Sequence, residues 1–138
     1  MTGAPVTPTE PRQAATVLLL RDGAPGLEVY LLRRTGKVGG SVDADAAAAD
    51  AKVCALNALA AIDDLVGLDS IARIVRVVGY VASAEGFTGQ PRVVNGASEF
   101  LGKIFGEAGQ HARSAVGVPV LPLGAAVEID AVVQVKAG

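Results

Sequence analysis

Arg113 and Glu128 are the two residues of this sequence whose types and spacing are best suited to chemistry. Arg113 stands in the run His-Ala-Arg-Ser-Ala-Val and Glu128 in Val-Glu-Ile-Asp, with a turn rich in Pro and Gly between them. A guanidinium holds a carboxylate through two parallel hydrogen bonds and keeps its charge on partial burial. A nearby carboxylate can orient water or move a proton. Arg113 and Glu128 are therefore candidates for the catalytic residues of a site for a small anionic substrate.

A simpler interpretation of these two residues stays open. Arg113 and Glu128 could pair with one another across strands and only hold the sheet together, since such ion pairs are common on strand surfaces. Other candidates offer less: His111 and Cys54 are the single histidine and the single cysteine, and a metal site needs several ligands. We expect neither a metal nor an organic cofactor. We interpret His111 as a solvated residue at the start of a strand and Cys54 as a small buried side chain of a helix.

Size and composition limit the class of protein. A chain of 138 residues, 51% hydrophobic and 4% aromatic, fits one domain with a core of small and branched side chains. A net charge of −2 gives no broad positive field for nucleic acid. No apolar run is long enough to span a membrane, and no signal peptide is evident. We expect a cytoplasmic protein that binds neither nucleic acid nor a membrane.

Hydrophobic periodicity and turn residues predict the elements that must position the two candidates. Residues 1–12 contain three prolines and predict a flexible tail, and residues 13–138 predict a single domain. The predicted elements are a hairpin of strands 14–21 and 27–34, a helix at 43–66, a strand at 71–82, a helix at 92–108, and strands at 113–118 and 126–135. This order predicts an α+β fold (β-β-α-β-α-β-β) with two helices packed on one face of a sheet.

The strands are apolar enough to raise the question of what covers the other face of this sheet. The residues concerned are Val75, Val77, Val127, Ile129, Val132 and Val133. Half of them would face water if the helices cover one face only, and no residues remain to build another layer. We therefore expect copies of the chain to cover that face.

Residues from about 35 to 135 resemble the Rid family of reactive intermediate deaminases, also called endoribonuclease L-PSP proteins. The resemblance rests on Thr-Gly-Lys-Val-Gly-Gly, Val-Cys-Ala-Leu-Asn-Ala-Leu, Val-Asn-Gly-Ala-Ser, Ala-Arg-Ser-Ala-Val, Leu-Pro-Leu-Gly and Val-Glu-Ile. It implies a chorismate-mutase-like fold, a homotrimer with the sheets inside and the helices outside, and three clefts between neighbouring subunits. It also implies hydrolysis of an enamine or imine, such as 2-aminoacrylate, to a keto acid and ammonia.

The resemblance assigns roles to individual residues. It implies that Arg113 grips the substrate carboxylate, that Glu128 positions water or transfers a proton, and that Asn95 lies near the cleft. Ala115 stands two residues after the arginine, where many family members carry cysteine, and Tyr80 is a candidate for an apolar wall. The Ser-Gly-Gln segment that lines the cleft in the family is absent from this sequence.

Residues from about 10 to 35 resemble something else, the first hairpin of a Nudix hydrolase. Such an enzyme holds Mg²⁺ with clustered glutamates on the next helix, and the helix predicted at 43–66 has aspartates but no glutamate. Diphosphate hydrolysis is therefore disfavoured. Two alternatives remain open: an imine or enamine deaminase with an incomplete site, and a trimer that binds a small carboxylate or a protein without turnover.

Overall fold

The computed structural model describes residues 14–20, as backbone only, and residues 36–136. The predicted tail at 1–12 and the predicted strand at 27–34 lie outside the described residues. The helices are α1 (Ala44–Val66) and α2 (Gln90–Phe105), and the strands are β1 (Ala14–Leu20), β2 (Ile71–Ala82), β3 (Ala112–Val118) and β4 (Val127–Val135). Short 3-10 helices at Leu68–Ser70, Gly106–Gly109 and Pro122–Gly124 join them.

Most of the predicted boundaries are confirmed to within one residue. The exception is α2, which begins at Gln90 and ends at Phe105, because a 3-10 turn over Gly106–Gly109 replaces the last turn predicted to reach residue 108. Pro91 in the first turn explains the early start, since proline needs no hydrogen-bond acceptor there.

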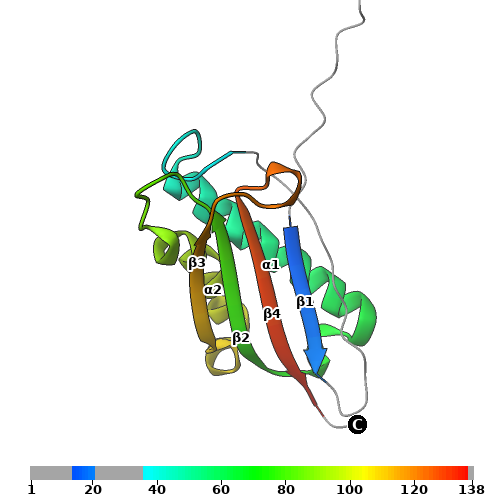
Figure 1. Ribbon diagram of the computed structural model, residues 1–138. Coiled ribbons are helices and arrows are strands. Elements are labelled where there is room, and N and C mark those ends of the chain that lie inside the picture. Colours follow the sequence, from blue (N-terminus) through cyan, green and yellow to red (C-terminus); the bar gives the residue numbers. More distant parts are fainter. Residues whose placement is uncertain (1–13, 21–35, 137–138) are drawn as a thin grey trace, which may run out of the picture.

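The described strands form one sheet in the order β1-β4-β2-β3. β2 pairs antiparallel with β4, while β1 pairs parallel with β4 and β3 pairs parallel with β2. Both helices lie on the same side of this sheet (Figure 1). The predicted α+β architecture is thus confirmed. We call the covered side the helix face and the other side the far face.

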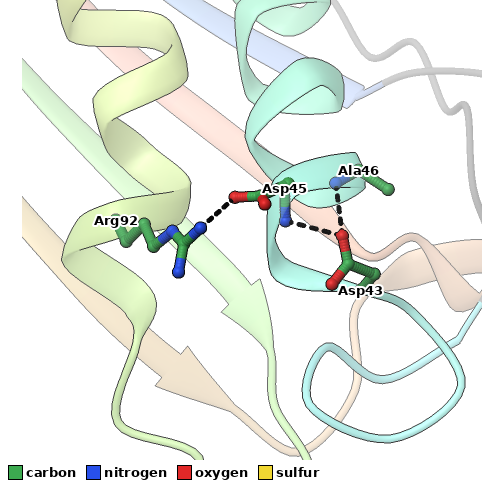
Figure 2. Close-up of polar contacts among 4 residues, drawn as sticks. All are labelled: Asp43, Asp45, Ala46 and Arg92. Atoms are coloured by element: carbon green, nitrogen blue, oxygen red, sulfur yellow. Dashed lines mark hydrogen bonds and ion pairs between the residues drawn. The ribbon is translucent and has the colours of Figure 1, made fainter.

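The beginning of α1 is fixed by a capping residue and tied to α2. Asp43 Oδ2 accepts hydrogen bonds from the backbone N–H groups of Asp45 and Ala46 at 3.0 and 3.2 Å (Figure 2). An aspartate at this position satisfies donors that have no partner within the helix and complements the helix dipole. Arg92, near the start of α2, reaches Asp45 with an Nη2–Oδ1 distance of 2.5 Å.

A glycine allows the two helices to approach closely. A Cβ added at Gly96 of α2 would lie 1.9 Å from the carbonyl oxygen of Ala48 on α1. The same helix packs on the sheet at Gly79, where an added Cβ would lie 2.2 Å from a methyl group of Val94. No side chain fits at either position, so these glycines set the spacing between the layers.

The main core lies between the helices and the sheet. From β4 it includes every second residue, as expected for a strand with one face buried: Val127, Ile129, Ala131, Val133 and Val135. In β2 the pattern differs, because two register shifts occur between Ile71 and Arg73 and between Ile74 and Arg76. These irregularities place Ile71, Ile74 and Val77, each three residues from the next, in the same core.

The expectation that the apolar strand residues are divided between the two faces is largely wrong. Four of the six residues named above belong to the core under the helices, namely Val77, Val127, Ile129 and Val133. The strand register places charged, polar and apolar residues together on the far face. Its residues include Arg76, Val78, Tyr80, Ser114, Val116, Glu128, Asp130 and Val132.

Candidate functional site

Strand β3 places Arg113 at the edge of the described sheet, on the helix face. Arg113 lies directly opposite Val77 of β2, and Ala115 lies opposite Gly79. Residues directly opposite each other on paired strands point to the same face. Val77 belongs to the core under the helices, so Arg113, Ala115 and then Gly117 follow one another along the side of β3 that faces α2.

Asn95 of α2 holds the arginine. Arg113 Nη1 donates a hydrogen bond to Asn95 Oδ1 at 2.5 Å, and both side chains are exposed. A guanidinium has five N–H donors, so this contact uses one and fixes the direction of the fork. The remaining donors are in a position to receive a carboxylate from solvent. The structure thus brings together two of the residues named from the sequence, Arg113 and Asn95.

Ala115 and Gly117 continue the same side of β3 with no reactive group. Ala115 is half-buried and packs against the main core. A Cβ at Gly117 would lie 2.7 Å from Gln90 Nε2 and 3.1 Å from Ser83 Oγ. Gln90 Nε2 donates to Ser83 Oγ at 3.1 Å and to the carbonyl oxygen of Phe87 at 2.7 Å. Sequence reasoning missed this polar pair; the signal available was a glycine at the next position of the same strand face.

Glu128 and Tyr80 lie together on the far face. They are directly opposite each other on β4 and β2. The neighbours of Glu128 in the strand, Val127 and Ile129, belong to the core on the helix face, so alternation along the strand directs Glu128 away from the helices. Tyr80 is half-buried and packs against a small second cluster formed by Ala82, Leu121 and Ala125.

Arg113 and Glu128 are therefore not neighbours within one chain. Strand β2 lies between β3 and β4, and the two residues are opposite Val77 and Tyr80, which are three residues apart and face opposite ways. The interpretation that they form a cross-strand ion pair within the chain is wrong. An ion pair that does lie on the far face joins Arg76 to Asp130, with a closest N–O distance of 3.6 Å.

His111 is not the solvated residue that the sequence predicts. It is half-buried, with Nε2 at 3.0 Å from Ser98 Oγ and Nδ1 at 2.6 Å from the carbonyl oxygen of Gly109. This contact could not be predicted from local sequence, because Ser98 is thirteen residues away and its approach depends on how α2 packs beside β3.

Cys54 is the small buried side chain that the sequence predicts. It is 1% exposed on α1, and its Sγ lies 3.9 Å from the carbonyl oxygen of Val127. Burial, together with the charges of Asp50 and Glu128, raises the pKa of the Cys54 thiol to about 12. A thiol that stays protonated is a poor nucleophile.

Two hollows are formed by residues of the segment 36–136. One hollow of about 230 Å³ lies between the helices and is lined by Lys52, Gly96 and Phe100, among others. Another of about 210 Å³ is lined by residues that include Lys37 and Val120. Neither includes Arg113 or Glu128. Over residues 36–136, no cluster of three or more potential metal ligands occurs, and no described helix is long and apolar enough to cross a membrane.

Comparison with known proteins identifies the family. The model of the family described as "YjgF/chorismate mutase-like, putative endoribonuclease" matches residues 4–133. The chain belongs to this family. The resemblance noted in the sequence is thereby confirmed, and the match extends through the segment at 10–35 where we noted a Nudix-like hairpin.

The chain is also similar to a protein of Trypanosoma cruzi and to solved structures. Protein TCP17 of Trypanosoma cruzi is 44% identical over 104 residues, which cover 74% of this chain and 65% of that protein. The crystal structure of Atu1372 from Agrobacterium tumefaciens, a protein of unknown function, has a TM-score of 0.74 at 42% identity and covers 76% of this chain and 69% of that one.

A crystal structure described as a putative endoribonuclease from Shewanella oneidensis MR-1 has a TM-score of 0.66 at 31% identity. That match covers 69% of this chain and 64% of the other. The chain thus spans about two thirds of the length of these relatives. The likeness agrees with the two-helix, one-sheet fold of the described residues.

Proposed function

We propose that this chain is an enamine or imine deaminase that works as a homotrimer, with each site built from two subunits. The observation that carries the proposal is the placement of Arg113 on the helix face and Glu128 on the far face. One chain cannot bring the two to a common substrate, whereas the edge strand β3 of one subunit can meet the far face of the next.

Arg113 has the features of a carboxylate clamp. Its guanidinium is exposed and aligned by Asn95, and a preset fork loses less freedom when it binds a planar carboxylate. Ala115, the next residue on the same side of β3, leaves a small apolar surface beside the clamp. A short substrate with one carboxylate, such as 2-aminoacrylate or its imine form, matches these dimensions and this charge.

Glu128 of the neighbouring subunit would serve as the proton carrier. Water attacks the imine carbon and forms the new C–O bond while the Glu128 carboxylate accepts a proton from that water. Starting from the protonated imine, this attack gives a neutral carbinolamine. Glu128 returns the proton to the nitrogen, the C–N bond breaks with loss of ammonia, and the hydroxyl proton passes to Glu128 and then to solvent as the C=O bond of the keto acid forms. The products are a keto acid and ammonia, and no electrons are exchanged, so the scheme needs neither a metal nor an organic cofactor.

The surfaces that would form the trimer are present in the described residues. β3 is an edge strand of the described sheet, and an edge has backbone groups that another chain can meet. On the far face, Val116 of β3 is 40% exposed, and Val120 and Leu123 in the following turn are more exposed still. Packing these residues against a neighbour would remove apolar surface from water.

A second candidate function is carboxylate binding without turnover. Ala115 favours it, because the position two residues after the arginine carries no thiol or other group that could take part in a reaction. In that case Arg113 and Asn95 would still bind small carboxylates, and only the chemical step would be missing.

Mixed subunits provide a direct test of the proposed site. Arg113→Ala and Glu128→Ala are each expected to reduce kcat/KM for 2-aminoacrylate hydrolysis by about a hundredfold or more. When the two variants are unfolded together and refolded, or are co-expressed, a site between subunits can combine an intact Arg113 with an intact Glu128. Random mixing restores about a quarter of the sites.

The outcomes separate the two functions. Recovery to about a quarter of the wild-type rate supports a site shared between subunits. No recovery would mean that the two residues act within one chain or not at all, and would overturn the proposal. A third outcome is that the wild type binds a keto acid, that Arg113→Ala does not, and that neither protein hydrolyses the imine. This outcome would identify the binding function instead.

A further inference from the structure

Two polar contacts connect β3 to α2, and only one of them involves the proposed clamp. The first joins Arg113 to Asn95. The second joins His111 to Ser98, with 3.0 Å between Nε2 and Oγ. Asn95 and Ser98 are three residues apart on α2 and thus share one side of the helix, while His111 stands two residues before Arg113. The second contact therefore lies directly beside the first.

The partners of His111 define which of its nitrogens carries the hydrogen. The carbonyl oxygen of Gly109, 2.6 Å from Nδ1, can only accept, so Nδ1 donates to it. In the neutral ring Nε2 is then an acceptor, and the hydroxyl of Ser98 donates to it. The imidazole thus connects the turn before β3 with the middle of α2.

Gly109 gives this connection a fixed end. It is buried, and a Cβ added there would lie 2.5 Å from the carbonyl oxygen of Leu101 on α2. The 3-10 turn over Gly106–Gly109 is therefore packed directly on the helix it follows. His111 is attached to this turn through Nδ1 and to Ser98 through Nε2, so its ring has little freedom to move.

The start of β3 needs such an anchor more than the two inner strands, β2 and β4, do. Within the described sheet β3 pairs with β2 alone, and its residues at 112–114 are all exposed. Edge strands with few buried side chains are the parts of a sheet that open most easily. Without a second tie to α2, the backbone that carries Arg113 would shift relative to Asn95.

We propose that His111 is a positioning residue, which together with Ser98 holds the start of β3 so that the Arg113 guanidinium stays aligned by Asn95. The inference rests on the proposed function, because it concerns the accuracy of the carboxylate clamp. It adds a role for two residues that touch neither substrate nor Glu128. Since a misaligned clamp still forms but costs free energy on binding, the effect should fall on KM more than on kcat.

Variants of the two residues separate positioning from filling space. His111→Phe keeps a ring of similar size without its nitrogens, and Ser98→Ala removes only the hydroxyl. We expect KM for the imine substrate to rise about tenfold in the first and about threefold in the second, with kcat changed less than about twofold. His111→Gln, which retains an amide that can reach Ser98, should recover part of the loss. Glu99→Gln, at the exposed position next to Ser98, is the matched control and should behave as the wild type.

Hydrogen exchange provides a measurement that does not depend on activity. Amide hydrogens of residues 112–118 should exchange faster in His111→Phe and Ser98→Ala, whereas those of β4 should stay as slow as in the wild type. Unchanged exchange and KM in both variants, with a large effect of Arg113→Ala on KM, would overturn the role of His111 and leave the proposed function intact. If Arg113→Ala has no effect on KM, the proposed function is refuted. The carboxylate clamp that His111 is inferred to align is then refuted as well.

Discussion

The helix face and the far face of the sheet are made by the same strands but carry different types of side chain. The helix face packs aliphatic side chains against α1 and α2, and it is so tightly filled that Gly79 and Gly96 leave no room for a methyl group. The far face mixes aliphatic residues with Tyr80, Glu128 and the Arg76–Asp130 ion pair. One face is covered by helices of the same chain, and the other is the face that we propose meets a neighbouring copy.

The difference suggests that the residues of the core and the residues we assign to the reaction lie in different parts of the sheet. Residues that must stay fixed, such as Cys54 and the core valines, lie under the helices. Residues that we assign to proton transfer lie on the far face, and the arginine lies at the edge where the two faces meet. Changes in the core under the helices should therefore act on folding, and changes at Arg113 or on the far face should act on assembly and activity.

The largest expected effect is the difference in Cys54 reactivity between the folded protein and the unfolded chain. Its pKa of about 12, against an ordinary value of 9.0, lowers the thiolate fraction at pH 8 by about a thousandfold. Iodoacetamide should therefore leave the folded protein unmodified and react quickly in urea. Between pH 9 and 11 the rate for the folded protein should keep rising with pH, because the thiol is still protonated there, while the rate for the unfolded chain levels off. Rapid labelling of the folded protein at pH 8 would contradict a closed helix face.

A pair of glycine substitutions in α2 tests the packing of the helix face. Gly96→Ala should lower the free energy of unfolding by about 3 kcal/mol, because the new methyl group would collide with the carbonyl oxygen of Ala48. Gly102→Ala is the matched control, since nothing lies within 4 Å of a Cβ at that position, and it should stabilise the helix by about 0.5–1 kcal/mol. Urea unfolding measures both, and equal effects would refute the close helix contact.

A charge on the far face should act on assembly instead. Val116→Glu is expected to weaken self-association by at least tenfold, or about 1.4 kcal/mol, because it buries an unpaired carboxylate in the proposed interface. Ile104→Glu on α2, at a site of similar exposure, should leave association unchanged. Sedimentation equilibrium measures the difference, and identical association of the two variants would show that the far face is not the contact surface.

The smallest effects should come from the polar start of α1, away from both faces. Asp43→Ala removes the cap of the helix and should cost about 1 kcal/mol of folding stability. Asp45→Ala removes the ion pair between Arg92 and Asp45, whose side chains are 66% and 70% exposed, respectively. This change should cost less than about 0.5 kcal/mol of folding stability. A loss for Asp45→Ala that matches or exceeds that for Asp43→Ala, measured by thermal unfolding, would contradict this ranking.

The sequence allowed the helices, the strands and the family to be predicted, because capping residues, glycines and apolar periodicity are local signals. The face on which each residue lies was harder to predict. Strict alternation along β2 would put Ile71 and Ile74 on opposite faces, yet two register shifts place both in the core. Such bulges depend on how neighbouring strands pair, and they could not be predicted from the residue types of β2.

The residues of the candidate site were named from the sequence, and their arrangement in space was not predicted. Arg113, Asn95 and Glu128 were named from their types and motifs, and the contact of Arg113 with Asn95 followed from helix packing. The separation of Arg113 from Glu128 follows from the strand order, in which β2 lies between β3 and β4. Strand order is a long-range property, so it cannot be read from the spacing of 15 residues between them.

That same strand order has a consequence for synthesis of the chain. β4 lies between β1 and β2, although it is the last of these strands to leave the ribosome. β1 therefore has no partner in the described sheet until residues 127–135 have emerged, and its contacts with β4 span more than a hundred residues of chain. Pairing over such separations closes large loops and is slow. During translation α1, β2, α2 and β3 can meet first, and completion of the sheet waits for its final strand.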